Sequence, residues 1–203
     1  MIWINGTFGV GKSTAGTGLV DALPALRLFD PEVVGYMLAQ SLKDQAFTDF
    51  QDLPAWRTLV PAVALEIRRH TGQDLVAVQT VLRQEYWAEL SAALNDLGEQ
   101  TFHVVLDADE PTLRSRIEND QLELTGRQWR LDHISQYAAA REWMVTAADL
   151  VVDTSRLAVQ EVVAHIAGAI NEELGVRTDG RGSELWRAAE QTPASHLTAH
   201  RLE

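Results

Sequence analysis

The chain has 203 residues, of which 46% are hydrophobic and 23% charged, the composition of one globular domain rather than of a disordered segment. Its net charge of −12 argues against nucleic acid or an anionic membrane surface as the main partner. Cysteine is absent, which excludes disulfides, thiolate catalysis and cysteine-ligated metals.

The sequence also lacks a signal-peptide pattern and any run of about 18 apolar residues, the length that a membrane span requires. We therefore expect a cytoplasmic protein without stable membrane insertion. The sequence leaves open whether it is a monomer or a homodimer.

Short apolar runs alternate with amphipathic stretches along the chain, a pattern typical of a parallel sheet covered by helices. The predicted strands are residues 2–5, 26–30, 75–80, 102–107 and 150–153. Helical spacing of apolar residues follows the third and the fifth of these strands. Residues 55–70 also look helical, but Pro61 predicts a kink or two shorter helices there.

The second half of the chain contains two segments without clear periodicity. Asp109 and Pro111 mark a helix start, and the stretch 120–130 that follows this helix holds Gly126 and two arginines. We expect this stretch to be a mobile lid. After Gly175 the chain becomes polar, which predicts the main domain over residues 1–175 and a C-terminal appendage over residues 176–203.

The most informative motif is a complete G-x-x-x-x-G-K-[ST] phosphate loop between the first strand and the first helix. Glycines let successive backbone N–H groups point at phosphate oxygens, and the following helix adds its positive dipole end. Lys12 is expected to reach the β- and γ-phosphates of ATP, and the Ser13 hydroxyl to coordinate Mg²⁺. Gly16 and Gly18 weaken the predicted helix by up to about 1 kcal/mol each. The predicted phosphate site comprises Gly6, Thr7, Phe8, Gly9, Val10, Gly11, Lys12, Ser13 and Thr14.

Other motifs narrow the kind of phosphate-loop protein. The D-x-x-G switch and N-K-x-D base reader of GTPases do not occur in the sequence. Asp107 follows an apolar strand but directly precedes a helix, which favours a capping role over a metal-binding one. The short chain and the arginines of the lid therefore indicate a small-molecule kinase.

Such a kinase needs a base for the acceptor hydroxyl and arginines for the transferring phosphoryl group. Asp30 closes the second strand at the sheet edge that faces the ligand, so it is the candidate base, although it could also cap the next helix. Arg127 and Arg130 are the candidate lid arginines, and the sequence does not decide which is essential. Arg116 is expected to stack on adenine or to lie solvated on a helix face.

Several segments resemble the tunicamycin-resistance ATP-binding proteins over nearly the whole chain. The most distinctive are the opening Trp3-Ile4-Asn5-Gly6 and the segment Pro54-Ala55-Trp56-Arg57, with Trp129 after the lid. The resemblance implies a three-layer α/β P-loop fold of the nucleoside- and shikimate-kinase type, with a five-stranded parallel sheet in the order 2-3-1-4-5. It also implies resistance to uridine-containing antibiotics.

By position, the resemblance places Trp56 and Arg57 at the acceptor site, with Gln79 and Thr80 lining its floor. The alternatives are that Trp56 belongs to the core and that Arg57 forms a surface ion pair.

The sequence thus predicts an enzyme that uses Mg²⁺ and ATP to phosphorylate a hydroxyl of a small molecule, with a sugar hydroxyl of a uridine-type nucleoside antibiotic as the favoured acceptor. A metabolic kinase for a nucleotide or sugar stays open. So does a protein that sequesters an antibiotic with ATP and performs no chemistry. Nucleotidyl transfer is disfavoured by the phosphate loop.

Overall fold

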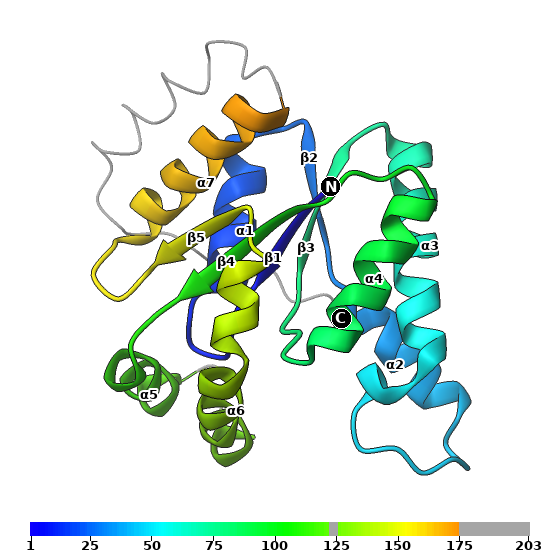
Figure 1. Cartoon of the computed structure of the whole chain (residues 1–203), viewed down its shortest axis with the longest axis horizontal. Helices are drawn as coiled ribbons and strands as arrows, with labels where there is room; N and C mark the ends of the chain where they lie inside the picture. Colours follow the sequence, from blue (N-terminus) through cyan, green and yellow to red (C-terminus); the bar gives the residue numbers. More distant parts are fainter. Residues whose placement is uncertain (122–125, 175–203) are drawn as a thin grey trace.

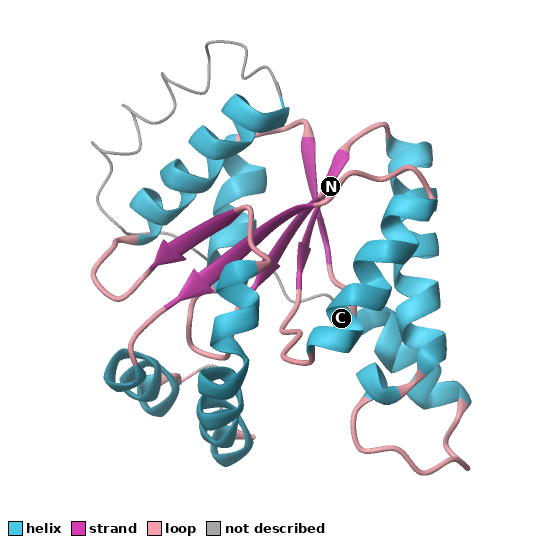
Figure 2. Cartoon of the chain, in the orientation of Figure 1, coloured by secondary structure: helices cyan, strands magenta, loops and turns pink. Residues whose placement is uncertain are grey.

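The predicted strands form one five-stranded parallel sheet in the order β2-β3-β1-β4-β5 (Figures 1 and 2). The computed structural model describes residues 1–121 and 126–174. The strands are β1 (Ile2–Asn5), β2 (Leu26–Phe29), β3 (Asp74–Val78), β4 (Phe102–Asp107) and β5 (Leu150–Asp153). β1 lies at the centre, where Ile2 is in register with Val76 on one side and Phe102 on the other. The predicted fold class and strand order are confirmed.

Helices cover both faces of the sheet, which gives the three-layer arrangement visible in Figure 1. One face is covered by α1 (Lys12–Ala22) and α7 (Val159–Leu174), and the other by α3 (Pro54–Thr71) and α4 (Gln84–Asp96), with α2 (Glu32–Ser41) beside α3. A short 3-10 helix, η1 (Phe50–Asp52), precedes α3. The chain leaves β4 into α5 (Glu110–Asn119) and α6 (Arg127–Thr146), which pack against each other beyond the carboxyl end of that strand.

Two apolar layers hold the sheet between its helices. Ile2 and Ile4 pack toward α1 and α7, whereas Trp3 packs on the opposite face with Trp56 and Trp87. The Trp3 and Trp87 rings meet edge to face with centroids 5.5 Å apart. Because both faces are buried, the strands read as nearly continuous apolar runs.

The first helix approaches its neighbours closely because two of its positions are glycine. A Cβ atom on Gly16 would lie 2.6 Å from Val78 Cγ2, and one on Gly18 would lie 2.8 Å from Val163 Cγ2. Glycine at these positions lowers the helix propensity of α1, but it allows the helix to pack closely against β3 and α7. This contact fixes the start of α1, where the phosphate loop ends.

The structure corrects the prediction for Pro61, because α3 is one helix of 18 residues that continues through it. Pro61 removes the hydrogen bond that its own nitrogen would give to the Arg57 carbonyl. The helix continues because one side of it, including Val60, Ala64 and Leu65, is buried against the sheet.

The last part of the stretch 120–130, predicted as a mobile lid, is helical in the structure. α6 starts at Arg127, so Arg127 and Arg130 lie in its first turn, after Gly126 with φ 74°. Residues 122–125 of the predicted lid and the predicted appendage 176–203 lie outside the described residues.

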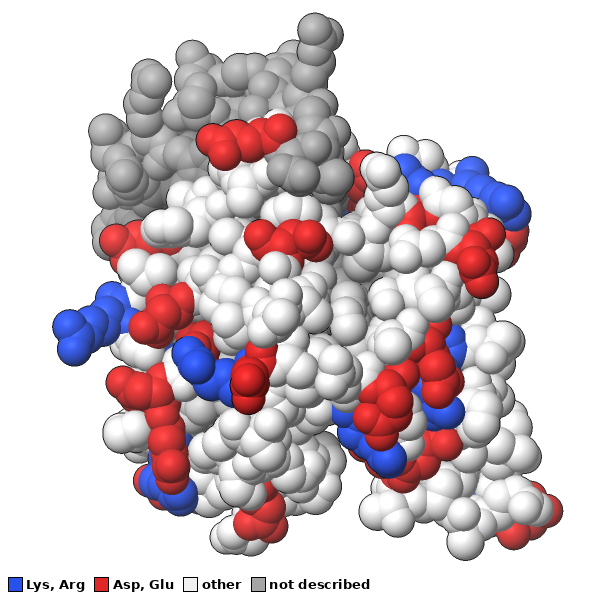
Figure 3. Space-filling model, in the orientation of Figure 1, with Lys and Arg blue, Asp and Glu red and all other residues white. Residues whose placement is uncertain are grey.

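The distribution of charged side chains and the apolar character of the helices agree with the composition. Acidic and basic side chains are interspersed over the described residues on the face drawn in Figure 3, without a broad basic area there. Among the described residues, no helix combines the length and the apolar character needed to cross a membrane.

Candidate active site

The phosphate loop joins the end of β1 at Asn5 to the start of α1 at Lys12 in a backbone conformation that only glycine adopts readily. Gly6 has φ 140°, and a Cβ atom there would lie 2.5 Å from the Leu106 carbonyl oxygen. Gly11 has φ 97° at the N-cap of α1. The loop therefore forms the open cradle of backbone N–H groups that a triphosphate requires.

Asn5 anchors this loop and was not predicted as a site residue. Its Oδ1 accepts hydrogen bonds from the backbone N–H groups of Gly6 at 2.8 Å and Val81 at 2.9 Å. Its Nδ2 donates to the Val81 carbonyl oxygen at 3.0 Å. One buried amide thus ties the phosphate loop to the segment that follows β3. A polar residue at the end of an apolar central strand, directly before the loop glycine, is the sequence signal that could have revealed it.

Lys12 reaches back over the loop and lies in the cavity above it. Its ammonium donates to the Thr7 carbonyl oxygen at 2.9 Å. Burial lowers the pKa of Lys12 to about 8, and the charge of Glu32 partly opposes this effect. A partly desolvated ammonium gains more from the negative charge of a phosphate than a fully hydrated one does.

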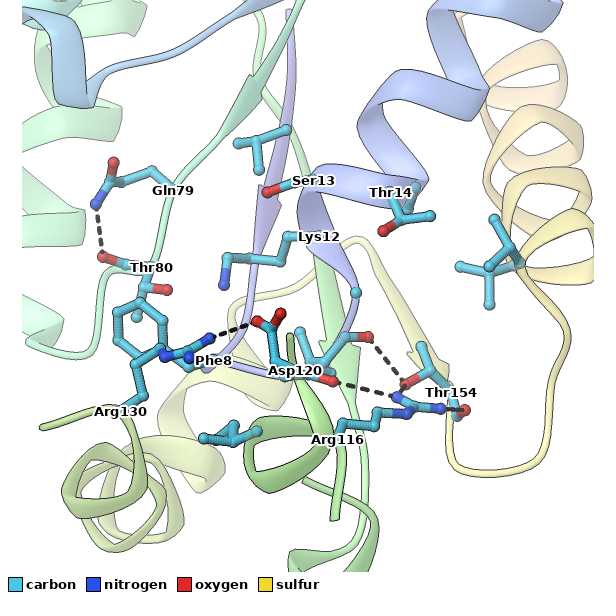
Figure 4. Close-up of a pocket in the computed structure, with 18 of the residues that line it drawn as sticks. Phe8, Lys12, Ser13, Thr14, Gln79, Thr80, Arg116, Asp120, Arg130 and Thr154 are labelled. Carbon is cyan, nitrogen blue, oxygen red and sulfur yellow. Dashed lines mark hydrogen bonds and ion pairs between the residues drawn. The ribbon is translucent and has the colours of Figure 1, made fainter. Parts of the chain in front are cut away.

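A single cavity of about 680 Å³ extends from the phosphate loop in both directions along the carboxyl edge of the sheet. In the view of Figure 4, Arg116 and Thr154 lie on one side of Lys12, and Gln79 and Thr80 lie on the other. The volume falls within the usual range of about 300–1,000 Å³ for small-molecule sites. We call the two regions the α7 side and the β3 side.

On the α7 side, Arg116 is fixed by backbone contacts. Its guanidinium donates to the Thr154 carbonyl oxygen at 2.7 Å, to Thr154 Oγ1 at 3.0 Å and to the Gly9 carbonyl oxygen at 3.4 Å. Arg116 is therefore not the solvated side chain that was the alternative. The apolar side chains of Leu157, Val159 and Val162 also line this region.

Thr154 is a second site residue that the sequence did not reveal. Its buried hydroxyl lies 3.1 Å from the carbonyl oxygens of both Val10 and Asp107. It therefore connects the phosphate loop, the end of β4 and Arg116. Its place directly after β5, at the carboxyl edge of the sheet, is the signal that could have found it.

On the β3 side, Asp30 lies both at the cavity and before the start of α2, the two positions that the sequence suggested. Its Oδ1 accepts from the Glu32 N–H at 2.9 Å, so it caps the start of α2, and it also lines the cavity. Gln79 and Thr80 are buried in the cavity wall. Among the described residues, the Oε1 atom of Gln79 has no hydrogen-bond partner. This side therefore offers a carboxylate, an amide and a hydroxyl to a ligand.

The two candidate lid arginines have different positions. Arg130 is 5% exposed, lines the cavity and forms an ion pair with Asp120 at 2.8 Å. Arg127 donates to the Asp120 carbonyl oxygen at 3.3 Å and is not among the residues that line the cavity. The structure thus brings Arg130, rather than Arg127, to the site.

Trp56 and Arg57 lie behind the β3 side and do not line the cavity. Trp56 is fully buried, and its Nε1 donates to the Pro31 carbonyl oxygen at 3.0 Å, so the structure favours the packing alternative for this ring. Arg57 forms the ion pair of the alternative, because its Nε donates to Glu89 at 2.6 Å, but Arg57 itself is only 8% exposed while the Glu89 side chain is 54% exposed.

Arg57 supports the cavity indirectly. It also donates to the Gln51 carbonyl oxygen, and the Gln51 side chain in turn donates to the Thr80 carbonyl oxygen at 3.0 Å.

The capping role predicted for Asp107 is wrong. The cap of α5 is Asp109, whose side chain accepts from the Thr112 N–H at 2.8 Å. Asp107 is still the last residue of β4, and its carboxylate accepts from the Tyr137 hydroxyl at 2.6 Å and from Arg141 at 2.6 and 2.9 Å. Burial, together with this hydrogen bond to Asp107, raises the pKa of Tyr137. Asp107 therefore joins β4 to α6.

The sheet order, the phosphate loop after the central strand and the arginine of α6 at the cavity together define a kinase-type P-loop protein that binds a nucleotide. The chain belongs to the AAA domain family AAA_33, whose family model matches residues 1–142.

Solved structures with the same fold agree with this assignment. The tunicamycin resistance protein of Deinococcus radiodurans is 26% identical, with 83% of this chain and 94% of that chain covered and a TM-score of 0.62. A sugar kinase from Janibacter sp. HTCC2649 is 17% identical, with 87% and 97% covered and a TM-score of 0.64. Shikimate kinase from Acinetobacter baumannii is 16% identical, with 84% and 92% covered and a TM-score of 0.56. The comparison with curated proteins gives no match. The resemblance to tunicamycin-resistance proteins seen in the sequence is confirmed.

Proposed function

We propose that this protein transfers the γ-phosphoryl group of ATP, with Mg²⁺, to a sugar hydroxyl of a uridine-type nucleoside antibiotic. The observation that carries the proposal is the shared cavity, in which Lys12 lies between an α7 side that holds Arg116 and Thr154 and a β3 side lined by Asp30 and Gln79. The similarity to a protein named for tunicamycin resistance supports the acceptor class.

The nucleotide is expected on the α7 side. Backbone N–H groups of the loop and the start of α1 bind the phosphates, Lys12 contacts the β- and γ-phosphates, and Arg116 lies toward the base. The hydroxyl of Ser13 and the carboxylate of Glu32 are hard oxygen donors at this cavity, which suits Mg²⁺. The metal would neutralise charge on the phosphates.

In the transfer step, Asp30, Lys12 and Arg130 have separate roles. The acceptor oxygen forms a bond to the γ-phosphorus while the bond from that phosphorus to the bridging oxygen breaks, and ADP leaves with the electron pair. Asp30 accepts the hydroxyl proton as general base. Lys12 and Arg130 stabilise the charge on the transferring group.

The charges at the cavity favour an uncharged acceptor. Among the described residues, the cations that line it are Lys12, Arg116 and Arg130. Lys12 and Arg130 are assigned to the phosphoryl group, and Arg116 is bound to Thr154 on the α7 side. The β3 side is therefore better suited to a neutral acceptor than to a carboxylate such as shikimate.

Gln79 gives the acceptor a specific partner. A uracil ring carries one imide N–H between two carbonyl oxygens. That N–H matches the Gln79 Oε1 atom, which is buried without a partner among the described residues. Binding would remove the cost of this unsatisfied acceptor, about 1–3 kcal/mol.

The test is incubation with Mg²⁺, ATP and, separately, tunicamycin, uridine, gluconate and shikimate, followed by mass spectrometry. Tunicamycin should gain one phosphate, about 80 Da, whereas gluconate and shikimate should not react. Lys12→Ala should abolish the product, and Lys43→Ala, at the chain's other lysine, should not. Addition of AMP would indicate nucleotidyl transfer, unmodified tunicamycin retained only with ATP would indicate sequestration, and phosphorylation of a sugar acid alone would indicate a metabolic kinase.

A further inference from the structure

Trp129 is a large aromatic side chain in the first turn of α6 that the mechanism does not use. It is 53% exposed, whereas Trp56 is fully buried. Its ring contacts Phe8 of the phosphate loop, with centroids 4.8 Å apart, and His133 one turn further along α6, at 4.1 Å. Phe8 and His133 are themselves 5.2 Å apart. We call these three side chains the aromatic rim.

The aromatic rim adjoins the cavity where the phosphoryl group would be transferred. Phe8 lines the cavity, and the Lys12 ammonium lies 5.4 Å from the centre of its ring. In Figure 4, Phe8 lies on the same side of Lys12 as Thr80. Phe8 is therefore on the β3 side, where the acceptor is expected. Trp129 and His133 contact Phe8 from just outside the set of residues that line the cavity.

The segment before α3 also reaches the β3 side, through Gln51. Asp49 precedes η1, and burial raises its pKa, while the hydrogen bond from Gln51 and the charge of His133 oppose that rise. Gln51 donates to the Thr80 carbonyl oxygen at 3.0 Å. Gln51 thus joins η1, in the connection before α3, to the backbone of the β3 side.

An exposed indole at this place is poorly explained by folding alone. Burying the ring of a tryptophan is strongly favourable, yet more than half of the Trp129 surface faces solvent, although its ring contacts Phe8 at the cavity. The neighbouring rings of Phe8 and His133 hold the indole in place. A preorganised exposed ring is the usual partner of a planar heterocycle.

We propose that Trp129, held by Phe8 and His133, is the surface on which a planar ring of the acceptor stacks. This inference rests on the proposed phosphotransfer and specifies its acceptor as a molecule with a nucleobase-like ring. Trp129 would determine acceptor specificity, and Trp56 would not contact the acceptor.

The test compares Trp129→Ala and Trp129→Phe with the wild type in steady-state phosphorylation of tunicamycin. Trp129→Ala should raise KM for tunicamycin about 5- to 100-fold, the range for the loss of one base–aromatic stack, and should change KM for ATP less than about 2-fold. Trp129→Phe should retain most of the affinity. Leu97→Ala is the matched control, because it removes a side chain that is 40% exposed at the end of α4 and is not part of the site.

Different results separate the failure of this inference from that of the proposed function. If Trp129→Ala lowers kcat or raises KM for ATP while KM for tunicamycin holds, the rim only packs α6 onto the phosphate loop and the inference is wrong. If the wild type binds tunicamycin or uridine in calorimetry without transfer, the proposed chemistry fails. A loss of that binding in Trp129→Ala would then still support stacking. Absence of any binding by the wild type would overturn both.

Discussion

Replacing Lys12 by methionine should make the nucleotide-free protein more stable while abolishing phosphoryl transfer. Burial lowers the pKa of Lys12 from 10.5 to about 8. At about 1.4 kcal/mol for each factor of ten, this difference corresponds to at most about 3 kcal/mol of lost stability when Lys12 is charged. Partial exposure of the side chain and its hydrogen bond to Thr7, worth about 1 kcal/mol, reduce the expected gain to about 1–2 kcal/mol.

The sign of the pH dependence follows from the direction of the shift. Between about pH 8 and pH 10.5 the unfolded chain binds the Lys12 proton more tightly than the folded protein does. The wild type is therefore penalised fully below pH 8 and gains stability from this group as the pH rises through that window. The advantage of Lys12→Met should be largest at pH 7 and should shrink toward pH 10.

Urea unfolding of the nucleotide-free proteins, followed by circular dichroism, measures these differences by linear extrapolation. Lys43→Met is the matched control, because it removes the chain's other lysine, which is exposed. A Lys12→Met protein no more stable than the wild type at pH 7, with Lys43→Met unchanged, would refute the reasoning that a poorly solvated ammonium costs stability at this site.

Three further substitutions test separate parts of the site. Asp30→Asn should lower kcat by about 10²–10⁴ with little change in KM for ATP, because a general base is lost; a loss of ATP affinity at unchanged kcat would instead assign Asp30 to the metal. Thr154→Val should raise KM for ATP and lower the free energy of unfolding by about 1–3 kcal/mol, because it removes the hydroxyl between Val10 and Arg116; an effect confined to the acceptor KM would contradict this. Trp56→Ala should lower the free energy of unfolding by about 3–5 kcal/mol, as expected for a fully buried ring; wild-type stability with a raised acceptor KM would return Trp56 to the acceptor site.

The features predicted well from the sequence are those that depend on residues close together in the chain. The phosphate loop needs glycines and a lysine at fixed short spacing, and each strand is visible as a short apolar run. Because short loops and the right-handed crossover rule restrict how such strands connect, few sheet orders were possible. The resemblance then selected the order that the structure has.

The features that were missed depend on contacts between distant parts of the chain. Asn5 bonds to a residue 76 positions away, and Thr154 bonds to one 144 positions away. The place of each residue at a strand end is visible in the sequence, but the distant partner that it contacts is not. Asp107 and Asp109 both precede α5, and only the point where β4 ends decides which one caps the helix.

The tryptophans show the same limit. Trp56 and Trp129 are both single aromatic residues near polar neighbours in the sequence. Whether such a ring faces the core or a cavity depends on how its helix is rotated in the fold, and a sequence pattern does not report this for an isolated residue. In the structure Trp56 is buried in α3, while Trp129 is exposed at the start of α6.

The central claim is that the γ-phosphoryl group moves from ATP to the acceptor, and isotope transfer measures this most directly. The protein is incubated with Mg²⁺, tunicamycin and ATP that carries ¹⁸O on its γ-phosphate, and the products are separated and weighed by mass spectrometry. We expect the labelled phosphate on tunicamycin, with one ADP formed for each molecule modified. Label released only as inorganic phosphate, or tunicamycin recovered unchanged, would contradict the claim.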